Sequence, residues 1–137
     1  MLIVVIDTNV LVGGLLKGRV AAKSIQALVD NKFILVISQS LIDELIDTIR
    51  KPKLARLISA SETEELLSTL LERASVVNPA FTLKFCRDPD DDMFLSCAVE
   101  GEASHIISWD QDLSVLSPFK GIEILTPGEF LKKFHIK

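Results

Sequence analysis

The sequence predicts an α/β fold, with helices on both faces of a central, mostly parallel sheet. Apolar runs rich in β-branched residues alternate with helical patterns along the whole chain. The expected strands are continuously apolar, which is typical of parallel strands buried on both faces. The length of 137 residues fits one domain of ordinary size, so we expect a single domain over residues 1–137.

The boundaries of the elements follow from local signals. The residue before Pro52 avoids the helical region, so a helix should end there. Ser61 begins a capping-box pattern that opens the next helix, and Pro127 suits the first position of the last one. Gly13 and Gly14 indicate a flexible or closely packed turn. We expect strands at residues 2–6, 33–37, 76–77, 105–109 and 122–125, and helices at 21–30, 39–50, 61–74, 91–99 and from 127 onward.

The composition excludes several classes of protein. A net charge of −4 and a pI of about 5.1 argue against a general DNA-coating protein, which would be basic. The apolar start lacks a basic region and contains Asp7, and no uninterrupted apolar run reaches the ~18 residues that would span a membrane. Cys86 and Cys97 lack metal-site spacing and suit the core of a reduced protein. We therefore expect a cytoplasmic protein without membrane contact.

Two acidic residues follow expected strands directly. Asp7 comes after the strand at residues 2–6, and Asp110 comes after the strand at 105–109. Ligands of open parallel sheets bind beyond the carboxyl ends of the strands, so these carboxylates would meet if their strands are neighbours. The alternative is that each is a turn or helix-cap residue, which is a common role for Asp after a strand.

Helical geometry selects two further acids. Glu44 lies at the border of the apolar stripe of its helix, whereas Asp43 and Asp47 fall on the solvated face. Asp91 belongs to an acidic run that starts at Asp88, and it shares a helix row with apolar residues, so it should point inward. The alternatives are a salt-bridged boundary residue for Glu44 and capping of a helix N-terminus for the acidic run.

Four converging carboxylates would repel one another and would be costly to bury. One or two Mg²⁺ or Mn²⁺ ions would remove that repulsion, because such ions prefer oxygen ligands and can hydrolyse phosphodiesters. A basic group after the Glu44 helix either contacts an RNA backbone or complements the helix C-terminus. It contains Arg50, Lys51, Lys53 and Arg56.

In the order of its motifs the sequence resembles the PIN-domain family, over almost its whole length. No single motif is decisive, but the ordered set is specific. The matching segments are Ile6-Asp7-Thr8-Asn9-Val10-Leu11-Val12, Ser38-x-x-Leu41-x-x-Glu44-Leu45, Arg87-Asp88-Pro89-Asp90-Asp91-Asp92-x-Phe94-Leu95, Ile106-Ile107-Ser108-Trp109-Asp110-x-Asp112-Leu113 and Ile124-Leu125-Thr126-Pro127-x-x-Phe130.

The resemblance is strongest to the VapC-like toxins of toxin–antitoxin pairs. It implies a Mg²⁺- or Mn²⁺-dependent ribonuclease that cuts RNA, forms a homodimer and is inhibited by a small antitoxin protein. The alternatives are a degenerate PIN-like module that binds RNA or protein without cutting, and a receiver-like phosphoacceptor. By motif position the catalytic and metal-binding acids would be Asp7, Glu44, Asp91 and Asp110, supported by Thr8, Asn9, Ser108, Asp112 and Asp88.

Two positions depart from the family pattern. Gly13-Gly14 stands where many relatives carry a small polar residue, and Trp109 stands where Gly is common. An exposed indole at this point would either offer a stacking surface to a base or pack against the protein.

Overall fold

A computed structural model of the chain describes residues 2–81 and 83–137 and contains one five-stranded sheet. The strand order is β3-β2-β1-β4-β5, and every neighbouring pair in it is parallel. The prediction of an α/β fold with a parallel sheet is therefore confirmed. The strands are β1 (Ile3–Ile6), β2 (Ile34–Ser38), β3 (Ala74–Val77), β4 (His105–Ile107) and β5 (Glu123–Leu125).

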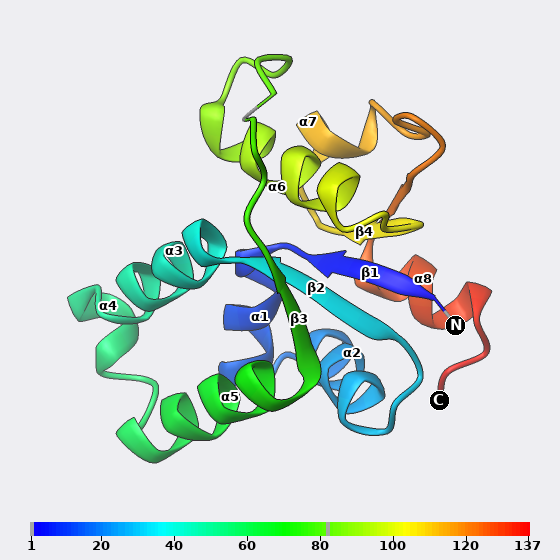
Figure 1. The fold of residues 1–137 in the computed structure, drawn as a ribbon. Coiled ribbons are helices and arrows are strands. Elements are labelled where there is room, and N and C mark those ends of the chain that lie inside the picture. The colour runs from blue at the N-terminus through cyan, green and yellow to red at the C-terminus, as the bar shows by residue number, and fades with distance from the viewer. Residues whose placement is uncertain (1, 82) are drawn as a thin grey trace.

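Helices cover both faces of this sheet (Figure 1). Helices α6 and α7 lie on one face, and α1, α2 and α5 lie on the other, where α2 also contacts α8. The helices are α1 (Thr8–Leu15), α2 (Arg19–Val29), α3 (Gln39–Ile49), α4 (Pro52–Ala55), α5 (Ala60–Arg73), α6 (Pro89–Glu100), α7 (Gln111–Ser114) and α8 (Pro127–Lys133). Among the described residues, none of these helices is long and apolar enough to cross a membrane.

The central strand β1 places Val4 and Val5 in the core with no exposed surface. Side chains alternate between the two faces of a strand, so burial of successive residues requires cover on both sides. Helix α6 supplies that cover on one face, where Leu95 is fully buried, and α1 supplies it on the other through Leu11. This double cover explains why the strand is apolar at every position.

His105 belongs to this core rather than to a site. Its ring lies edge-on to Phe134 at 5.1 Å between centroids, and its Nδ1 is 2.7 Å from the hydroxyl of Ser104. Burial lowers the pKa of His105 below its usual value, so the ring is neutral near pH 7.

Several predicted boundaries were wrong. Residues 8–15 form the helix α1, with Gly13 and Gly14 inside it rather than in a turn. The capping box that starts α5 uses Ser59 and Glu62 instead of Ser61. The segment Ser59-Ala60-Ser61-Glu62 has the same pattern two residues earlier, and helix formation from there satisfies more backbone groups.

The short helices α4 and α7 were not predicted, because four residues are too few to show a helical period. Strand β4 ends at Ile107, so Ser108 and Trp109 lie between the strand and Asp110. Asp110 is the N-cap of α7. The prediction that it follows the strand directly was therefore wrong.

Candidate metal centre

The candidate centre lies at the carboxyl ends of β1 and β4, which are neighbours in the sheet. The register places Ile6 beside Ile107, so the segments that follow the two strands leave the sheet side by side. Asp7 follows β1 as the N-cap of α1, and Asp110 caps α7. The two carboxylates were expected to meet if their strands are neighbours, and β1 and β4 are neighbours.

Ser108 connects the two segments. Its hydroxyl donates a hydrogen bond to Oδ2 of Asp7 at 2.6 Å and accepts one from the backbone N–H of Asp110 at 3.0 Å. The other carboxylate oxygen of Asp7 accepts from the backbone N–H of Asn9 at 3.1 Å, while the Asn9 side chain is exposed. The orientation of the Asp7 carboxylate is thus fixed by two donors before any ligand binds.

Helix α6 brings further carboxylates from the other side. Oxygen atoms of Asp91, Asp110 and Asp112 all lie within 4.8 Å of one another. Asp91 is buried, as its helical position predicts, whereas Asp112 is exposed and pairs loosely with Arg87 at 3.8 Å. Asp88 is the exposed N-cap of α6 and accepts from the N–H of Asp90 at 2.9 Å.

Glu44 reaches the centre from α3 and is half-buried, at the border between the apolar and solvated faces. The hydroxyl of Thr8 donates to its carboxylate at 3.3 Å, so the first turn of α1 positions Glu44. Asp43 and Asp47 are exposed, as predicted, and they line a groove on α3 together with Glu44. All four acids of the predicted quartet therefore line one region of the fold.

Crowding makes this region electrostatically unfavourable without a cation. Burial, a hydrogen bond to Asp110 and the charge of Asp110 together raise the pKa of Asp91 to about 7. Burial also raises the pKa of Asp7, which outweighs the hydrogen bonds from Ser108 and Asn9, and Asp110 adds to the rise. Burial and then the charge of Asp90 raise the pKa of Glu44.

These oxygens match the preferences of a hard divalent ion. Mg²⁺ and Mn²⁺ take carboxylate oxygens, and a bound cation would favour the ionised form of each crowded acid. The sequence motif predicts that Asp112 only supports the metal ligands. The distances between carboxylate oxygens instead group Asp112 with Asp91 and Asp110. The donor set therefore fits a divalent metal, with Asp112 as an additional candidate ligand.

Asp92, the last acid of the run, serves the surrounding structure. It is buried, and its Oδ1 accepts from the backbone N–H groups of Phe85 at 3.0 Å and Cys86 at 2.8 Å. The sequence offers no signal for this contact, because the donors lie six and seven residues upstream in a segment without a regular period. Asp92 holds the segment that leads into α6 against that helix.

Replacing Asp92 with Ala is expected to lower the free energy of unfolding by about 1–3 kcal/mol, because two backbone donors would lose their acceptor. Urea denaturation would measure the change. The matched control is Asp90→Ala, which removes an exposed carboxylate from the same helical turn. Equal effects from the two substitutions would contradict the anchoring role.

The basic group of Arg50, Lys51, Lys53 and Arg56 is exposed around α4. Lys51 lines a groove of about 490 Å³ together with Glu44 and Asp90, so the basic group lies beside the Glu44 end of the centre. A contact between this group and an RNA backbone remains a prediction.

Trp109 and Gly13, the two departures from the family pattern, pack against each other. A Cβ atom at Gly13 would lie 3.1 Å from both Cη2 and Cζ3 of the indole, which is tighter than an ordinary contact. Trp109 is still 47% exposed. The Trp109 ring thus fits in this place because Gly13 has no side chain.

Replacing Gly13 with Val is expected to displace the Trp109 ring and to destabilise the fold by about 1–3 kcal/mol through overpacking. The chain has one Trp and no Tyr, so a change in intrinsic fluorescence reports on this ring alone. Gly128→Val is the matched control, because a Cβ at Gly128 would meet nothing within 4 Å. Unchanged emission in the Gly13 variant would refute the packing.

Comparisons with known proteins address the fold and the family of the chain. An uncharacterised protein of Methanocaldococcus jannaschii is 28% identical over an alignment of 142 positions, which covers 96% of this chain and 91% of the relative. A chain of the VapBC2 structure from Rickettsia felis, bound to a promoter DNA fragment, superposes with a TM-score of 0.59 at 14% identity. That match covers 90% of this chain and 97% of the other, and it supports the fold. The PIN-domain model matches residues 3–112, so the chain belongs to the PIN-domain family.

Proposed function

We propose that this protein is a metal-dependent endoribonuclease and the toxin component of a toxin–antitoxin pair. The observation that carries the proposal is the grouping of the Asp91, Asp110 and Asp112 carboxylates within 4.8 Å of one another, beside Asp7 at the ends of two adjacent parallel strands. Helix capping explains Asp7 and Asp110 individually, but it does not explain why the buried Asp91 lies close enough to interact with both of their carboxylates. A cluster of this kind is stable at neutral pH when a cation neutralises it.

Asp7, Asp91 and Asp110 would hold one divalent ion, with Asp112 at its exposed side and Glu44 serving a second ion or an ordered water. When bound, such an ion lowers the pKa of a coordinated water and neutralises charge on a phosphodiester. The chain itself holds the carboxylates in position before an ion binds. Ser108 fixes the Asp7 carboxylate, and Thr8 fixes that of Glu44.

The test is cleavage of a mixed, labelled single-stranded RNA pool with Mg²⁺ or Mn²⁺, with EDTA in a parallel sample. Asp110→Asn should abolish cleavage, whereas Asp30→Asn, an exposed change after α2, should leave it intact. Cleavage that resists EDTA would contradict the proposal. RNA binding without cleavage under all metal conditions would instead support the alternative of a non-catalytic binding module.

The toxin role is supported by the resemblance to VapC-like proteins and by the fold shared with a chain of the Rickettsia felis VapBC2 structure. We propose an antitoxin partner and a homodimer on the same grounds. Co-expression with a small protein encoded beside this gene should suppress both RNA cleavage and growth arrest. Sedimentation of the isolated chain would measure its oligomeric state, and a monomer would contradict the homodimer.

A further inference from the structure

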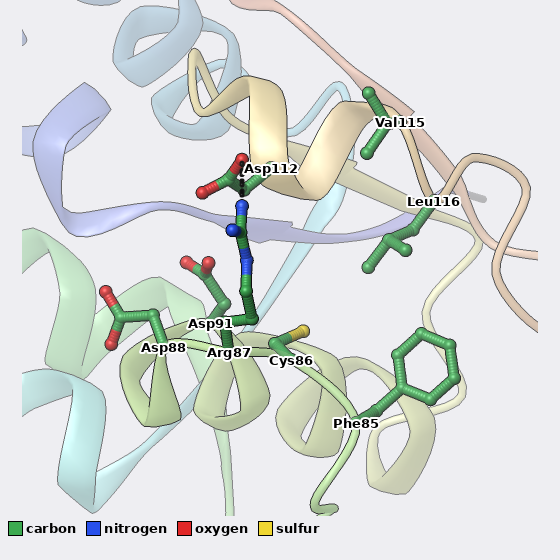
Figure 2. Close-up of a pocket in the computed structure, with 8 residues that line it drawn as sticks. All are labelled: Phe85, Cys86, Arg87, Asp88, Asp91, Asp112, Val115 and Leu116. Atoms are coloured by element: carbon green, nitrogen blue, oxygen red, sulfur yellow. Dashed lines mark ion pairs between the residues drawn. The ribbon is translucent and has the colours of Figure 1, made fainter.

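A pocket of about 210 Å³ opens beside the candidate metal centre, and its two walls differ in chemistry. Figure 2 shows the carboxylates of Asp91 and Asp112 on one side, with Phe85 and Leu116 on the other. Asp91 and Asp112 also belong to the group of candidate metal ligands. The pocket is therefore continuous with the centre, and a molecule bound at the carboxylates would extend toward the apolar wall.

The apolar wall presents an aromatic face to solvent. Phe85 is 60% exposed, although its ring leans on the buried Phe119 at 5.2 Å between centroids and 59° between planes. Phe119 thus supports the ring from one side and leaves most of its surface open. Val115 and Leu116 line the same wall from the segment after α7. An exposed apolar surface beside a polar centre is typical of a ligand-binding site.

The aromatic wall is held in place before a ligand arrives. Asp92 accepts hydrogen bonds from the N–H groups of Phe85 and Cys86, and Ser96 accepts one from the N–H of Leu83 at 2.8 Å. Both acceptors belong to α6, the helix that carries Asp91. The distance between the aromatic ring and the candidate metal ligands is therefore set by one helix.

Arg87 is the basic residue among the eight that line the pocket, and it lies between the two walls (Figure 2). Its side chain is 94% exposed, and its guanidinium lies 3.8 Å from the carboxylate of Asp112. An exposed pair at this distance contributes little to stability. The guanidinium can therefore leave Asp112 and bind a phosphate or the edge of a base instead. Its several N–H donors suit both kinds of acceptor.

We propose that this pocket binds an unpaired nucleobase of the RNA, next to the phosphate held at the carboxylates. The inference rests on the proposed function and adds to it a base-binding subsite formed by Phe85 and Arg87. The groups of the pocket lie in the same order as the parts of a nucleotide. The candidate metal ligands would hold the phosphate, Arg87 lies beside them, and Phe85 would contact the base. Aromatic side chains stack on bases that are free of a duplex, whereas a paired base is already stacked and cannot enter.

The test uses the full chain carrying Asp7→Asn, with Mg²⁺, so that binding is measured without cleavage. The probe is a short mixed-sequence single-stranded RNA that contains the fluorescent base 2-aminopurine, whose emission falls when it stacks. Phe85→Ala should raise the Kd about 5- to 100-fold and remove the quenching. Phe85→Tyr should restore both, and Arg87→Ala should weaken binding.

Phe81→Ala is the matched control, because Phe81 is an 83% exposed aromatic of the same connecting segment that does not line the pocket. Its Kd should stay within about twofold of the parent value. Melting temperatures of all variants, measured alongside, distinguish loss of binding from loss of folding. Preferential binding of the parent to single-stranded RNA over a hairpin of the same sequence is also expected.

Equal affinities of the Phe85→Ala and Phe81→Ala variants for the RNA would overturn the inference. If the otherwise unmodified chain then still cleaves RNA with metal, the nuclease proposal stands and the base pocket alone fails. If that chain neither binds nor cleaves RNA, both fail together. Loss of binding to a protein partner in Phe85→Ala, with RNA affinity unchanged, would assign the pocket to that partner and also overturn the inference.

Discussion

Replacing Asp7 with Asn should reduce metal-dependent RNA cleavage by about 10²–10³-fold or more, with the fold unchanged. A metal ion contributes several kcal/mol to transition-state stabilisation, and each ~1.4 kcal/mol corresponds to a tenfold change in rate. Asn lacks the negative charge that holds the ion. It still offers an oxygen to the N–H of Asn9, so the N-cap of α1 is preserved.

The choice of Asn over Ala follows from the contacts of Asp7. Ala would remove both the helix cap and the acceptor for the Ser108 hydroxyl, which lies 2.6 Å away. A loss of activity in Asp7→Ala would therefore combine loss of metal binding with a local structural change. In Asp7→Asn, the melting temperature without metal should equal or exceed that of the parent, because one of several crowded charges is gone.

Asp30→Asn is the control for this experiment. It removes an equal charge from an exposed position after α2 that does not line the groove beside Glu44. Rates are measured on the same RNA pool at saturating Mn²⁺. Cleavage by Asp7→Asn at the parent rate would remove Asp7 from the metal-binding set, whereas equal losses in both variants would indicate a general charge effect.

The parallel sheet could be predicted because its central strands have a distinctive apolar pattern in the sequence. Burial on both faces makes β1 apolar at every position and β4 apolar at Ile106 and Ile107, and the intervening helices set a parallel direction. Helix α1 could not be predicted, because two adjacent glycines disfavour a helix by about 1 kcal/mol each. The structure uses them for close approach: a Cβ at Gly14 would lie 2.2 Å from Cδ1 of Ile25. Tertiary packing outweighs local propensity there.

The candidate site could be predicted where a residue's position follows from one regular element. Asp7 was found from the end of β1, Asp91 from its inward helix row and Glu44 from the border of a stripe. The grouping of Asp112 with Asp91 depends on α7, a helix of four residues that periodicity does not reveal. The role of Asp92 depends on a loop folding back, which no local pattern encodes.

Mg²⁺ or Mn²⁺ is expected to raise the melting temperature strongly at pH 8 and much less at pH 5.5. An ion at a hundred times its Kd adds about 2.7 kcal/mol, which for a domain of this size is roughly 10 °C. The ion binds ionised carboxylates, and the pKa of Asp91 is raised from 3.8 to about 7. One displaced proton makes the ion bind about tenfold more weakly at pH 6 than at pH 8.

The metal-free protein should show the opposite trend in stability. A carboxyl group with a raised pKa binds its proton more tightly in the folded state than in the unfolded chain. Its stabilising contribution is complete below the unfolded value of 3.8 and is lost as the pH rises through about 7. The raised pKa values of Asp7 and Glu44 act in the same direction.

Asp91→Asn separates these effects, because an amide has neither the charge nor the proton. The variant should lose most of the metal-induced rise in melting temperature at pH 8, and its metal-free stability should vary less between pH 4 and pH 7. Differential scanning fluorimetry with and without EDTA measures both. Asp30→Asn, an exposed change after α2, should keep the parent behaviour. A full metal response in Asp91→Asn would mean that the buried carboxylate of α6 faces the centre without binding the ion.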